Sequence, residues 1–183
     1  IMLTEILEIL YYSYEKIDFV DEPVDLGFNC PLDLHCSYTR DQILVAMDFM
    51  KPNTVREGVK YMNEKKADIF FVTLNKADKE YSPSTMYNDY SINDTLFHWQ
   101  SQSTISPDSN TGQRYINHRE TRDKELLFVR EFKSNKLGAA PYTFLGLVDF
   151  VSSEGSKPMN IVWKLKKPIP AKYLKKTNKL VVG

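Results

Sequence analysis

Apolar residues recur along this chain with two periods, and each period predicts one kind of secondary structure. In residues 4–15 they lie three to four positions apart, which places them on one face of a helix, and Thr4 can cap its start. Thr39 and Gln42 form a capping-box pattern that predicts a second helix, ending near Phe49. The residues that this second helix turns inward are Ile43, Leu44 and Met47.

Further along the chain the period becomes two, which is typical of strands. Residues 67–74 are almost continuously apolar and predict a central strand. Residues 142–150 and 159–165 alternate between apolar and polar side chains, which predicts half-buried antiparallel strands joined by a turn at 152–158. Further elements are expected at residues 95–102 (strand), 125–132 (strand) and 170–176 (short helix). The mixture of helices and strands indicates the α+β class.

The length and composition favour one globular domain. The chain has 183 residues, of which 42% are hydrophobic, and this is enough to bury a core. It lacks any apolar run near the roughly 20 residues of a membrane-spanning helix. Cys30 and Cys36 are expected to be reduced, in the cytoplasm, because no signal peptide precedes them. Since the first residue is Ile1, we expect a fragment of a longer protein.

Acidic and basic residues are equal in number, 24 of each, but they are unevenly distributed. Residues 1–25 carry seven acids and one lysine, whereas residues 157–183 carry eight lysines and no acid. A zero net charge argues against a general polyanion-binding protein, although a local basic face is enough to attract phosphate. The lysine-rich end is therefore either a weak nucleic-acid contact or a solvated tail.

The middle of the chain, residues 79–122, is a long polar segment whose composition is typical of a recognition surface. On a strand at 95–102, His98, Gln100 and Gln102 point to one side and Trp99 to the other. Two amides and an imidazole can donate to and accept from a base edge, and Trp99 with nearby tyrosines can sandwich a flat ring. The alternative is that Trp99 belongs to the core and the amides face solvent.

A second polar cluster lies in residues 106–122. Gly112 permits a tight turn there, and the neighbouring arginines and hydroxyls are suited to gripping a phosphate backbone. The alternative is a solvated loop whose arginines pair with Glu120 and Asp123.

Metal binding and independent catalysis are not favoured. Cys30, His35 and Cys36 give three potential ligands, whereas structural zinc sites use four in paired short spacings. His98 and His118 could act as general bases, but the chain has no nucleophile elbow, phosphate-binding glycine loop or HExxH motif. We therefore expect no cofactor, no metal and no enzyme activity of the chain alone.

Several runs of residues carry a resemblance to a known family. They are HCSYTRDQI (35–43), DIFFVTLN (68–75), LFHWQSQS (96–103), TGQRYINH (111–118), YTFLG (142–146) and MNIVWKL (159–165). In these runs the chain resembles the C-terminal domain of unknown function of bacterial phospholipase-D-nuclease/helicase proteins. These include type IV, modification-dependent restriction enzymes of the SauUSI type. The resemblance covers residues 30–170, and residues 1–29 resemble the helical linker that leads out of the helicase portion.

The resemblance implies a reader of 5-methylcytosine in double-stranded DNA, with 5-hydroxymethylcytosine as a second candidate. It implies that residues 30–183 form a PUA/SRA-like (SET-and-RING-associated) twisted antiparallel β-barrel with flanking helices, preceded by a helical arm at 1–29. The nuclease and helicase domains of the same polypeptide are the implied partners, and they hold the ATP-dependent cleavage activity.

A reader of this kind is expected to flip the base out of the duplex, at a cost on the order of a few kcal/mol. Stacking faces that each contribute about 1–3 kcal/mol can return that cost. The preferred pair is Trp99 with Tyr90, and Asp89 would accept from the cytosine amino group, with Asp94 as the reserve. The candidate base-binding residues are Trp99, Tyr90, Asp89, Tyr81, Tyr115, His98, Gln100 and Ser101. The candidate DNA-backbone residues are Arg114, His118, Arg119, Gln113, Thr111, Lys164, Lys166 and Lys167.

Two other classes of function remain open from the sequence. One is a metal-dependent nuclease that uses His98 and His118. The other is a module that docks the helicase or dimerises the enzyme through the tyrosine-rich first helix.

Overall fold

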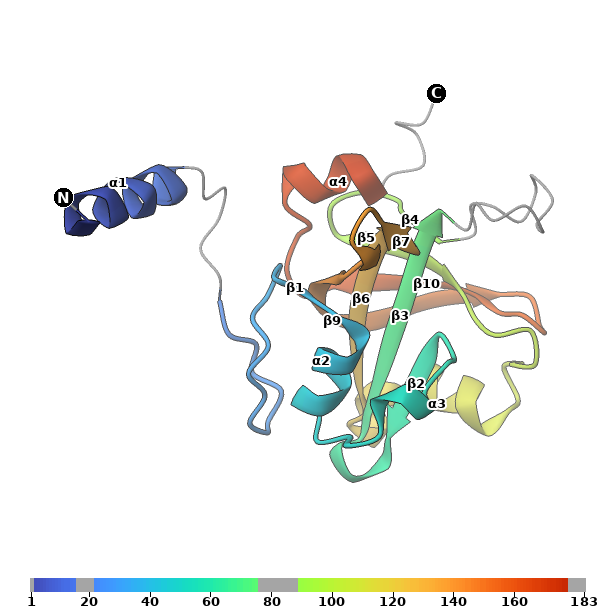
Figure 1. The fold of residues 1–183 in the computed structure, drawn as a ribbon. Helices are drawn as coiled ribbons and strands as arrows, with labels where there is room; N and C mark the ends of the chain where they lie inside the picture. Colours follow the sequence, from blue (N-terminus) through green and yellow to red (C-terminus); the bar gives the residue numbers. More distant parts are fainter. Residues whose placement is uncertain (1, 16–21, 76–88, 178–183) are drawn as a thin grey trace.

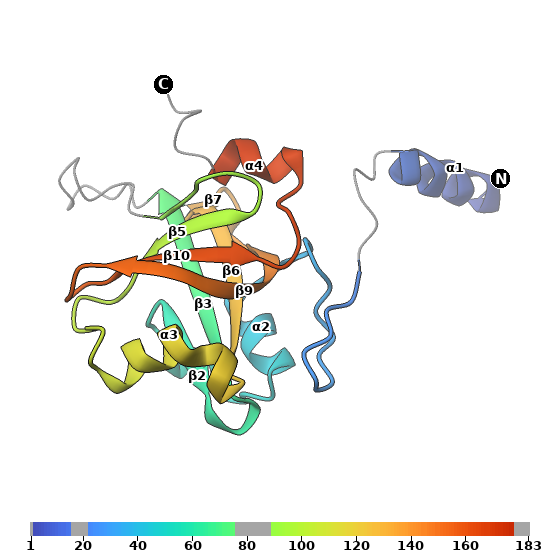
Figure 2. The ribbon, with the colours of Figure 1, turned by 180° about the vertical axis from the view of Figure 1, so that it is seen from behind.

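The computed structural model describes residues 2–15, 22–75 and 89–177, in which helices and strands form an α+β fold (Figures 1 and 2). The helices are α1 (Met2–Glu15), α2 (Arg40–Ala46), α3 (Asn110–Thr121) and α4 (Ala171–Thr177), with the short 3-10 helices η1 (Pro52–Thr54) and η2 (Asn63–Lys65). The strands are β1 (Ser37–Tyr38), β2 (Val59–Met62), β3 (Ala67–Asn75), β4 (Tyr90–Ser91), β5 (Leu96–Gln100), β6 (Lys124–Phe132), β7 (Ser134–Asn135), β8 (Gly138–Ala139), β9 (Tyr142–Glu154) and β10 (Asn160–Leu165).

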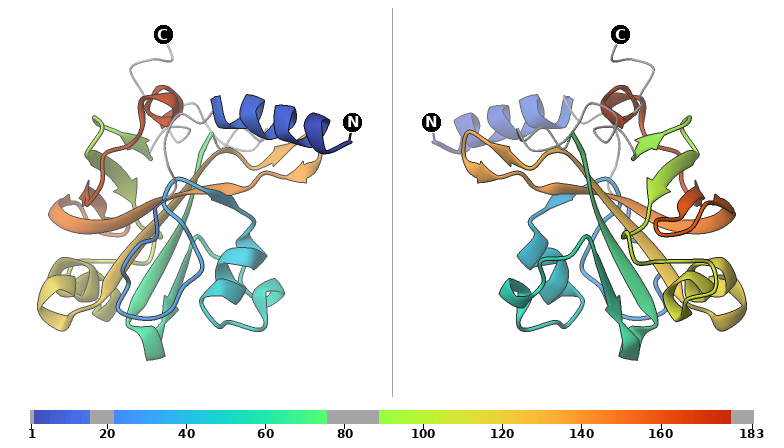
Figure 3. Two further views of the ribbon diagram at one scale, coloured as in Figure 1. Left: turned by 90° about the vertical axis from the view of Figure 1, so that its left-hand side faces the viewer. Right: turned by 90° about the vertical axis from the view of Figure 1, so that its right-hand side faces the viewer.

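Eight of the described strands pair into one bent sheet (Figure 3). Its order is β2-β3-β6-β9-β10-β5-β4, with β1 paired to β9, while β7 and β8 form a separate hairpin. The predicted α+β class is thus confirmed. The closed barrel implied by the resemblance is not confirmed, because the end strands β2 and β4 do not pair with each other.

Strands β3 and β6, next to the β2 edge of the sheet, form a parallel pair, with Ala67 opposite Lys124 and Asn75 opposite Phe132. Their apolar side chains alternate between two cores. The α2-side core takes Ile69 and Phe71 from β3, and the α3-side core takes Phe70. Figure 3 shows α2 and α3 on opposite sides of β3. Because this pair is covered on both faces, its sequence is continuously apolar instead of alternating.

The capping box of α2 is confirmed: Thr39 Oγ1 accepts from Gln42 N, and Thr39 N donates to Gln42 Oε1. The helix ends at Ala46, earlier than the predicted Phe49. The reason is local, because Asp48 adopts a positive φ of 64° and Phe49 N donates back to Leu44 O. Residues on the inward face are fully buried as predicted, namely Ile43, Leu44 and Met47.

Strand β9 is longer than predicted, because it continues through Ser152 to Glu154 before the turn to β10. It also changes partner along its length, pairing with β1 and β6 first and with β10 later. Gly146 lies at the register shift in the pairing of β9 with β6, with φ at 91° and the Leu34 Cδ1 atom 2.8 Å from where a Cβ would be. Only glycine combines this backbone conformation with this close approach.

Helix α3 corrects the expectation of a loop in residues 106–122. Ser109 caps it by accepting a hydrogen bond from Gly112 N, and Tyr115 and His118 follow on the buried face. Gly112 therefore allows the helix to pack closely against the preceding backbone, since a Cβ there would lie 2.0 Å from Ser106 O. The three-residue spacing of Gly112, Tyr115 and His118 was the signal for this helix.

A polar cluster lies between α3 and the parallel strands. Asp68 is fully buried, and Arg114 of α3 holds it through two hydrogen bonds, from Nε at 2.6 Å and from Nη2 at 3.0 Å. The Arg114 guanidinium also lies 3.9 Å from the centre of the Tyr61 ring. Buried charges need such partners, so this ion pair fixes α3 against the sheet.

Glu125 stands beside Asp68 on the neighbouring strand, and it is fully buried. Neither of its carboxyl oxygens has a hydrogen-bond partner among the described residues. Burial raises the pKa of Glu125 well above its usual value, and the negative charge of Asp68 raises it further. The uncharged form of Glu125 is therefore the one that the fold favours.

We expect Glu125→Gln to stabilise the fold increasingly as pH rises. The wild-type carboxyl is protonated more readily in the folded than in the unfolded state, so stability is greatest below the unfolded pKa of about 4.3 and is lost as pH rises through the folded pKa. The amide removes this loss, so the two free energies of unfolding diverge by up to about 1.4 kcal/mol per pH unit above pH 4.3. Urea unfolding between pH 4 and 8 measures it. Exposed Glu154→Gln is the control, and parallel pH curves for Glu125→Gln and wild type would contradict the assignment.

Candidate functional site

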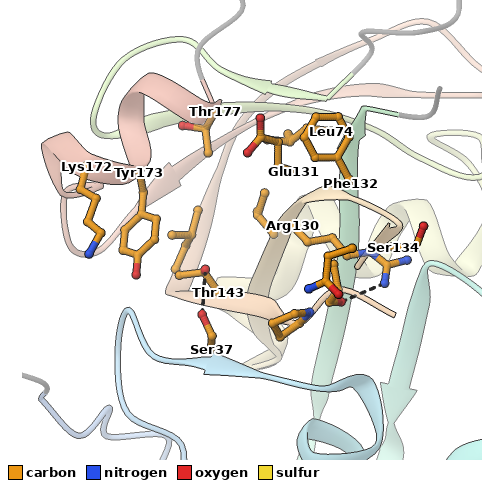
Figure 4. Close-up of a pocket in the computed structure, with 15 residues that line it drawn as sticks. Ser37, Leu74, Arg130, Glu131, Phe132, Ser134, Thr143, Lys172, Tyr173 and Thr177 are labelled. Atoms are coloured by element: carbon orange, nitrogen blue, oxygen red, sulfur yellow. Dashed lines mark hydrogen bonds between the residues drawn. The ribbon is translucent and has the colours of Figure 1, made fainter. Parts of the chain in front are cut away.

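A pocket of about 440 Å³ opens where α4 meets β1, β6 and the β7–β8 hairpin (Figure 4). We call it the α4 pocket. Its volume lies in the range of about 300–1,000 Å³ that small-molecule sites occupy. The residues that line it are Ser37, Leu74, Val129, Arg130, Glu131, Phe132, Ser134, Asn135, Ala140, Pro141, Thr143, Leu145, Lys172, Tyr173 and Thr177.

Apolar and polar groups divide the lining of the α4 pocket. Leu74, Val129 and Leu145 belong to the α3-side core and give it an apolar base. In Figure 4, Tyr173 and Thr143 lie on one side and Arg130 on the other. This combination of an apolar base with a few convergent polar groups is typical of a ligand site.

Hydrogen bonds set the positions of several polar side chains around the α4 pocket. The Thr143 and Ser37 hydroxyls lie 3.3 Å apart, and the Tyr173 hydroxyl donates to His35 O at 3.4 Å. At the far end of α4, the Thr177 hydroxyl is 2.7 Å from Ser91 Oγ, and both residues are buried. The wall that α4 contributes is thus bonded to His35, just before β1, at one end and to β4 at the other.

Arg130 is held in place by neutral partners. Its Nε donates to Thr73 Oγ1 at 2.9 Å, its Nη1 donates to Ala140 O at 3.1 Å, and its guanidinium lies 4.4 Å from the centre of the Tyr142 ring. Burial lowers the pKa of Arg130 from its usual value. Among the described residues no carboxylate forms an ion pair with it. Its ring partner Tyr142 belongs to the α2-side core, whereas Val129 and Leu145 of the pocket's apolar base belong to the α3-side core.

A second group of predicted residues gathers on the outer face of β5 and its neighbours. The Tyr90 and His98 rings stack with centroids 4.8 Å apart, and Gln100 Nε2 donates to Asn160 Oδ1 at 3.2 Å. The strand register places Lys164 on the same face. The predicted grouping of His98 and Gln100 with a tyrosine is therefore present in the structure.

The predicted sandwich of Trp99 and Tyr90 is not formed, because strand alternation sends the two side chains to opposite faces of the sheet. Trp99 is only 5% exposed and packs against Phe70 at 4.7 Å and Tyr115 at 5.7 Å between ring centroids. Tyr115 and Trp99 are thus core residues whose rings are covered by protein. The alternative weighed for Trp99, a place in the core, is the one that the structure supports.

Two other predicted base contacts have structural partners. Asp89 is buried, and its Oδ1 accepts from Gln100 N at 2.9 Å. Ser101 is buried too, where its hydroxyl accepts from Met159 N and donates to Gln102 O. Asp94 is exposed, and Tyr81 lies outside the described residues.

Of the predicted backbone contacts on α3, Arg114 and His118 point into the protein. Arg114 is committed to Asp68, as described above. His118 Nε2 accepts from Phe150 N at 3.0 Å, so its proton lies on Nδ1, which is 3.3 Å from Asp123 O. Burial lowers the pKa of His118, which favours this neutral form. These two side chains stabilise the fold and are not placed to touch a phosphate.

Three of the remaining predicted cations, Arg119, Lys166 and Lys167, are at the surface with a carboxylate beside each of them. Arg119 and Lys166 both pair with Asp149, and Lys167 pairs with Glu22 at 3.2 Å. On α3, Gln113 is exposed and donates to Pro107 O, while Thr111 is half-buried. Lys164 is the exposed predicted cation that lies on the Tyr90–His98 face.

The described residues contain no group of three or more His, Cys, Asp or Glu side chains arranged to hold a metal ion. Cys30 and Cys36 are free thiols, and Cys30 Sγ lies 3.9 Å from Met47 Sδ. No helix in the described part of the chain is both long enough and apolar enough to cross a membrane.

The α4 pocket was missed from the sequence because its residues come from six elements, β1, β3, β6, β7, β9 and α4, and from the segment between β8 and β9. Arg130 and Thr143 lie within strands that the apolar pattern assigns to the core, and Tyr173 lies in a short helix of lysines. One signal was present, since Arg130 directly follows the apolar run from Leu126 to Val129, where a partly buried charge needs partners.

Taken together, these features define an α+β domain with a ligand-sized pocket beside α4. Residues 32–176 match the family model described as domain of unknown function (DUF3427), and the chain belongs to this family. No curated protein matches the chain.

We expect Arg114→Ala to destabilise the fold by about 3 kcal/mol, because it leaves the Asp68 carboxylate buried without its partner. Arg119→Ala, on the exposed side of the same helix, should change stability by less than about 0.5 kcal/mol. Chemical denaturation of both variants measures the difference. Equal stabilities would mean that Arg114 is free for a ligand after all.

Proposed function

We propose that this chain reads modified cytosine in double-stranded DNA, and that the α4 pocket receives the flipped base. The observation that carries the proposal is the pocket itself, which combines an aromatic ring, a carboxylate, hydroxyls and cationic side chains over an apolar base. The candidates are 5-methylcytosine and 5-hydroxymethylcytosine, as the resemblance implies. A base can enter such a pocket only after leaving the stack, which costs on the order of a few kcal/mol.

Each part of a modified cytosine has a counterpart in the α4 pocket. The Tyr173 ring offers a stacking face, worth about 1–3 kcal/mol for a base. The Glu131 carboxylate can accept from the exocyclic amino group, which thymine lacks. Leu145 and Val129 can surround a methyl group at C5. Together, the stacking face, the carboxylate and the apolar surround would give the specificity for modified cytosine that the proposed function requires.

Cations at the α4 pocket favour an anionic ligand such as a nucleotide. Lys172 lies beside Tyr173 on α4, and Arg130 of the pocket lining forms no ion pair with a described carboxylate. The face formed by Tyr90, His98 and Lys164 offers a second polar surface for the duplex. Contacts of this kind hold a duplex in register without reading its sequence.

The proposal includes the larger assembly that the resemblance implies. The chain would be the specificity domain of an ATP-dependent type IV restriction endonuclease, with nuclease and helicase domains of the same polypeptide as partners in the bacterial cytoplasm. The bent sheet with helices on both sides is compatible with an SRA-like fold. The chain alone would then bind DNA without cleaving it.

Titration of the full chain against one short duplex tests the proposal. The duplex is prepared with cytosine, 5-methylcytosine or 5-hydroxymethylcytosine at one position, at about 0.15 M salt, because affinity depends on salt. We expect a modified duplex to bind at least about tenfold tighter than the unmodified one, with discrimination lost in Tyr173→Ala.

Tyr90→Ala is the matched control, since it removes the same side chain from the other candidate surface. Discrimination kept in Tyr90→Ala and lost in Tyr173→Ala supports the α4 pocket, whereas the reverse pattern moves the base site to the outer face of β5. Equal affinity for all three duplexes would reject a modified-base reader altogether.

A further inference from the structure

A second pocket, of about 730 Å³, lies at the opposite end of the β3–β6 pair from the α4 pocket, and we call it the lysine pocket. Its Lys124 lies opposite Ala67, the first residue of β3, whereas Leu74 near the end of β3 lines the α4 pocket. The two ends are about 23 Å apart at roughly 3.3 Å per residue, and Figures 1 and 2 show β2 near one and α4 near the other. The residues that line the lysine pocket are Gly27, Phe28, Met47, Asp48, Phe49, Lys60, Tyr61, Met62, Asn63, Glu64, Lys65 and Lys124.

Three partly buried lysines distinguish this pocket. Lys60, Lys65 and Lys124 are partly buried, whereas every other lysine whose side chain is described is exposed. Lysine is normally exposed, because taking its ammonium group out of water is costly unless a partner compensates. The fold therefore concentrates its partly buried ammonium groups in one place.

Aromatic rings set the positions of the three ammonium groups. Lys65 Nζ lies 4.6 Å and Lys124 Nζ 5.9 Å from the centre of the Phe28 ring, and Lys60 Nζ lies 4.5 Å from the centre of the Phe49 ring. A ring face attracts an ammonium group and leaves N–H donors over for an anion. Among the described residues, neither Lys60 nor Lys124 donates a side-chain hydrogen bond or forms an ion pair.

Carboxylates balance only part of the charge in the lysine pocket. Asp48 Oδ2 pairs with Lys65 Nζ at 2.6 Å, and the Asp48 side chain is 71% exposed. Glu64, the other acid of the lining, is exposed and pairs with none of the three lysines among the described contacts. Lys60 and Lys124 therefore keep their charges for a ligand, in a pocket whose volume suits a small molecule.

We propose that the lysine pocket binds a phosphate group. Its ammonium groups come from β2, η2 and β6, and a phosphate has several anionic oxygens that can accept from donors in different directions. The phosphate belongs to a free nucleotide or to a nucleic-acid backbone, which present the same chemistry to the lysines. The inference does not rest on the proposed base pocket, because the two pockets share no residue.

Isothermal titration calorimetry of the full chain with inorganic pyrophosphate tests the proposal. At about 50 mM salt, where exposed charges are only partly screened, we expect a Kd of about 1 mM or tighter. The double variant Lys60→Gln/Lys124→Gln removes both unbalanced charges and keeps side chains that can cover the rings, so binding should weaken at least about tenfold. Lys136→Gln/Lys157→Gln removes two exposed charges outside both pockets and should bind like wild type.

Asp48→Asn should change the affinity in the opposite direction. The substitution frees Lys65 from its carboxylate, so pyrophosphate should bind about threefold tighter or more. Asparagine also suits the positive φ of 64° at this position, so the backbone need not change. Lysines that only cover Phe28 and Phe49 would leave this variant and Lys60→Gln/Lys124→Gln with wild-type affinity, which would overturn the proposal.

Two further outcomes would also overturn it, namely no binding up to about 10 mM pyrophosphate and an equal loss of affinity in Lys136→Gln/Lys157→Gln. Urea unfolding of each variant checks that the fold is intact. Tyr173→Ala should bind pyrophosphate like wild type, so the lysine pocket and the base pocket can fail separately.

An unmodified DNA duplex identifies the source of the phosphate. If Lys60→Gln/Lys124→Gln lowers duplex affinity and makes the salt dependence shallower by about 0.9 for each lost contact, the phosphate belongs to the nucleic-acid backbone. If this variant binds the duplex like wild type but loses pyrophosphate, the ligand is a free nucleotide.

Discussion

The parallel pair of β3 and β6 is covered by the α2-side core on one face and by the α3-side core on the other. Every neighbouring element must therefore supply apolar cover for these two strands, and α2, α3 and β9 do so. The pair also carries two acidic side chains, Asp68 and Glu125, into a place without solvent. Arg114 of α3 neutralises the buried charge of Asp68. Helix α3 therefore covers the parallel strands and also supplies the ion-pair partner that one of them needs.

The fold was predictable where the chain repeats a local pattern. The capping box at Thr39 predicts α2, and the alternation of apolar and polar residues predicts β9 and β10. Both patterns can be found in the sequence because they involve residues that are close together along the chain. The parallel pairing of β3 with β6 and the open edge of the sheet were not predictable in this way. They depend on which strands meet across long stretches of chain, and no local pattern records that choice.

The candidate site was less predictable than the fold. Polar residues in an apolar neighbourhood were interpreted as recognition groups, but Arg114 and His118 turn inward to satisfy buried partners. The residues of the α4 pocket look ordinary in the sequence because they come from several elements that are far apart along the chain. These residues form a pocket only when β6, β9 and α4 pack together, so a pocket of this type is a property of the tertiary structure.

One wall of the α4 pocket comes from a seven-residue helix at the far end of the described chain. Tyr173 and Leu174 of this helix pack against the α3-side core, whose last buried residue is Ile169. Substitutions at other positions of α4, such as Lys172, can thus alter what the pocket accepts while the sheet keeps its packing. Such a division lets selection diversify ligand preference within a family at little cost in foldability, because the scaffold and the adjustable wall occupy separate segments of the gene.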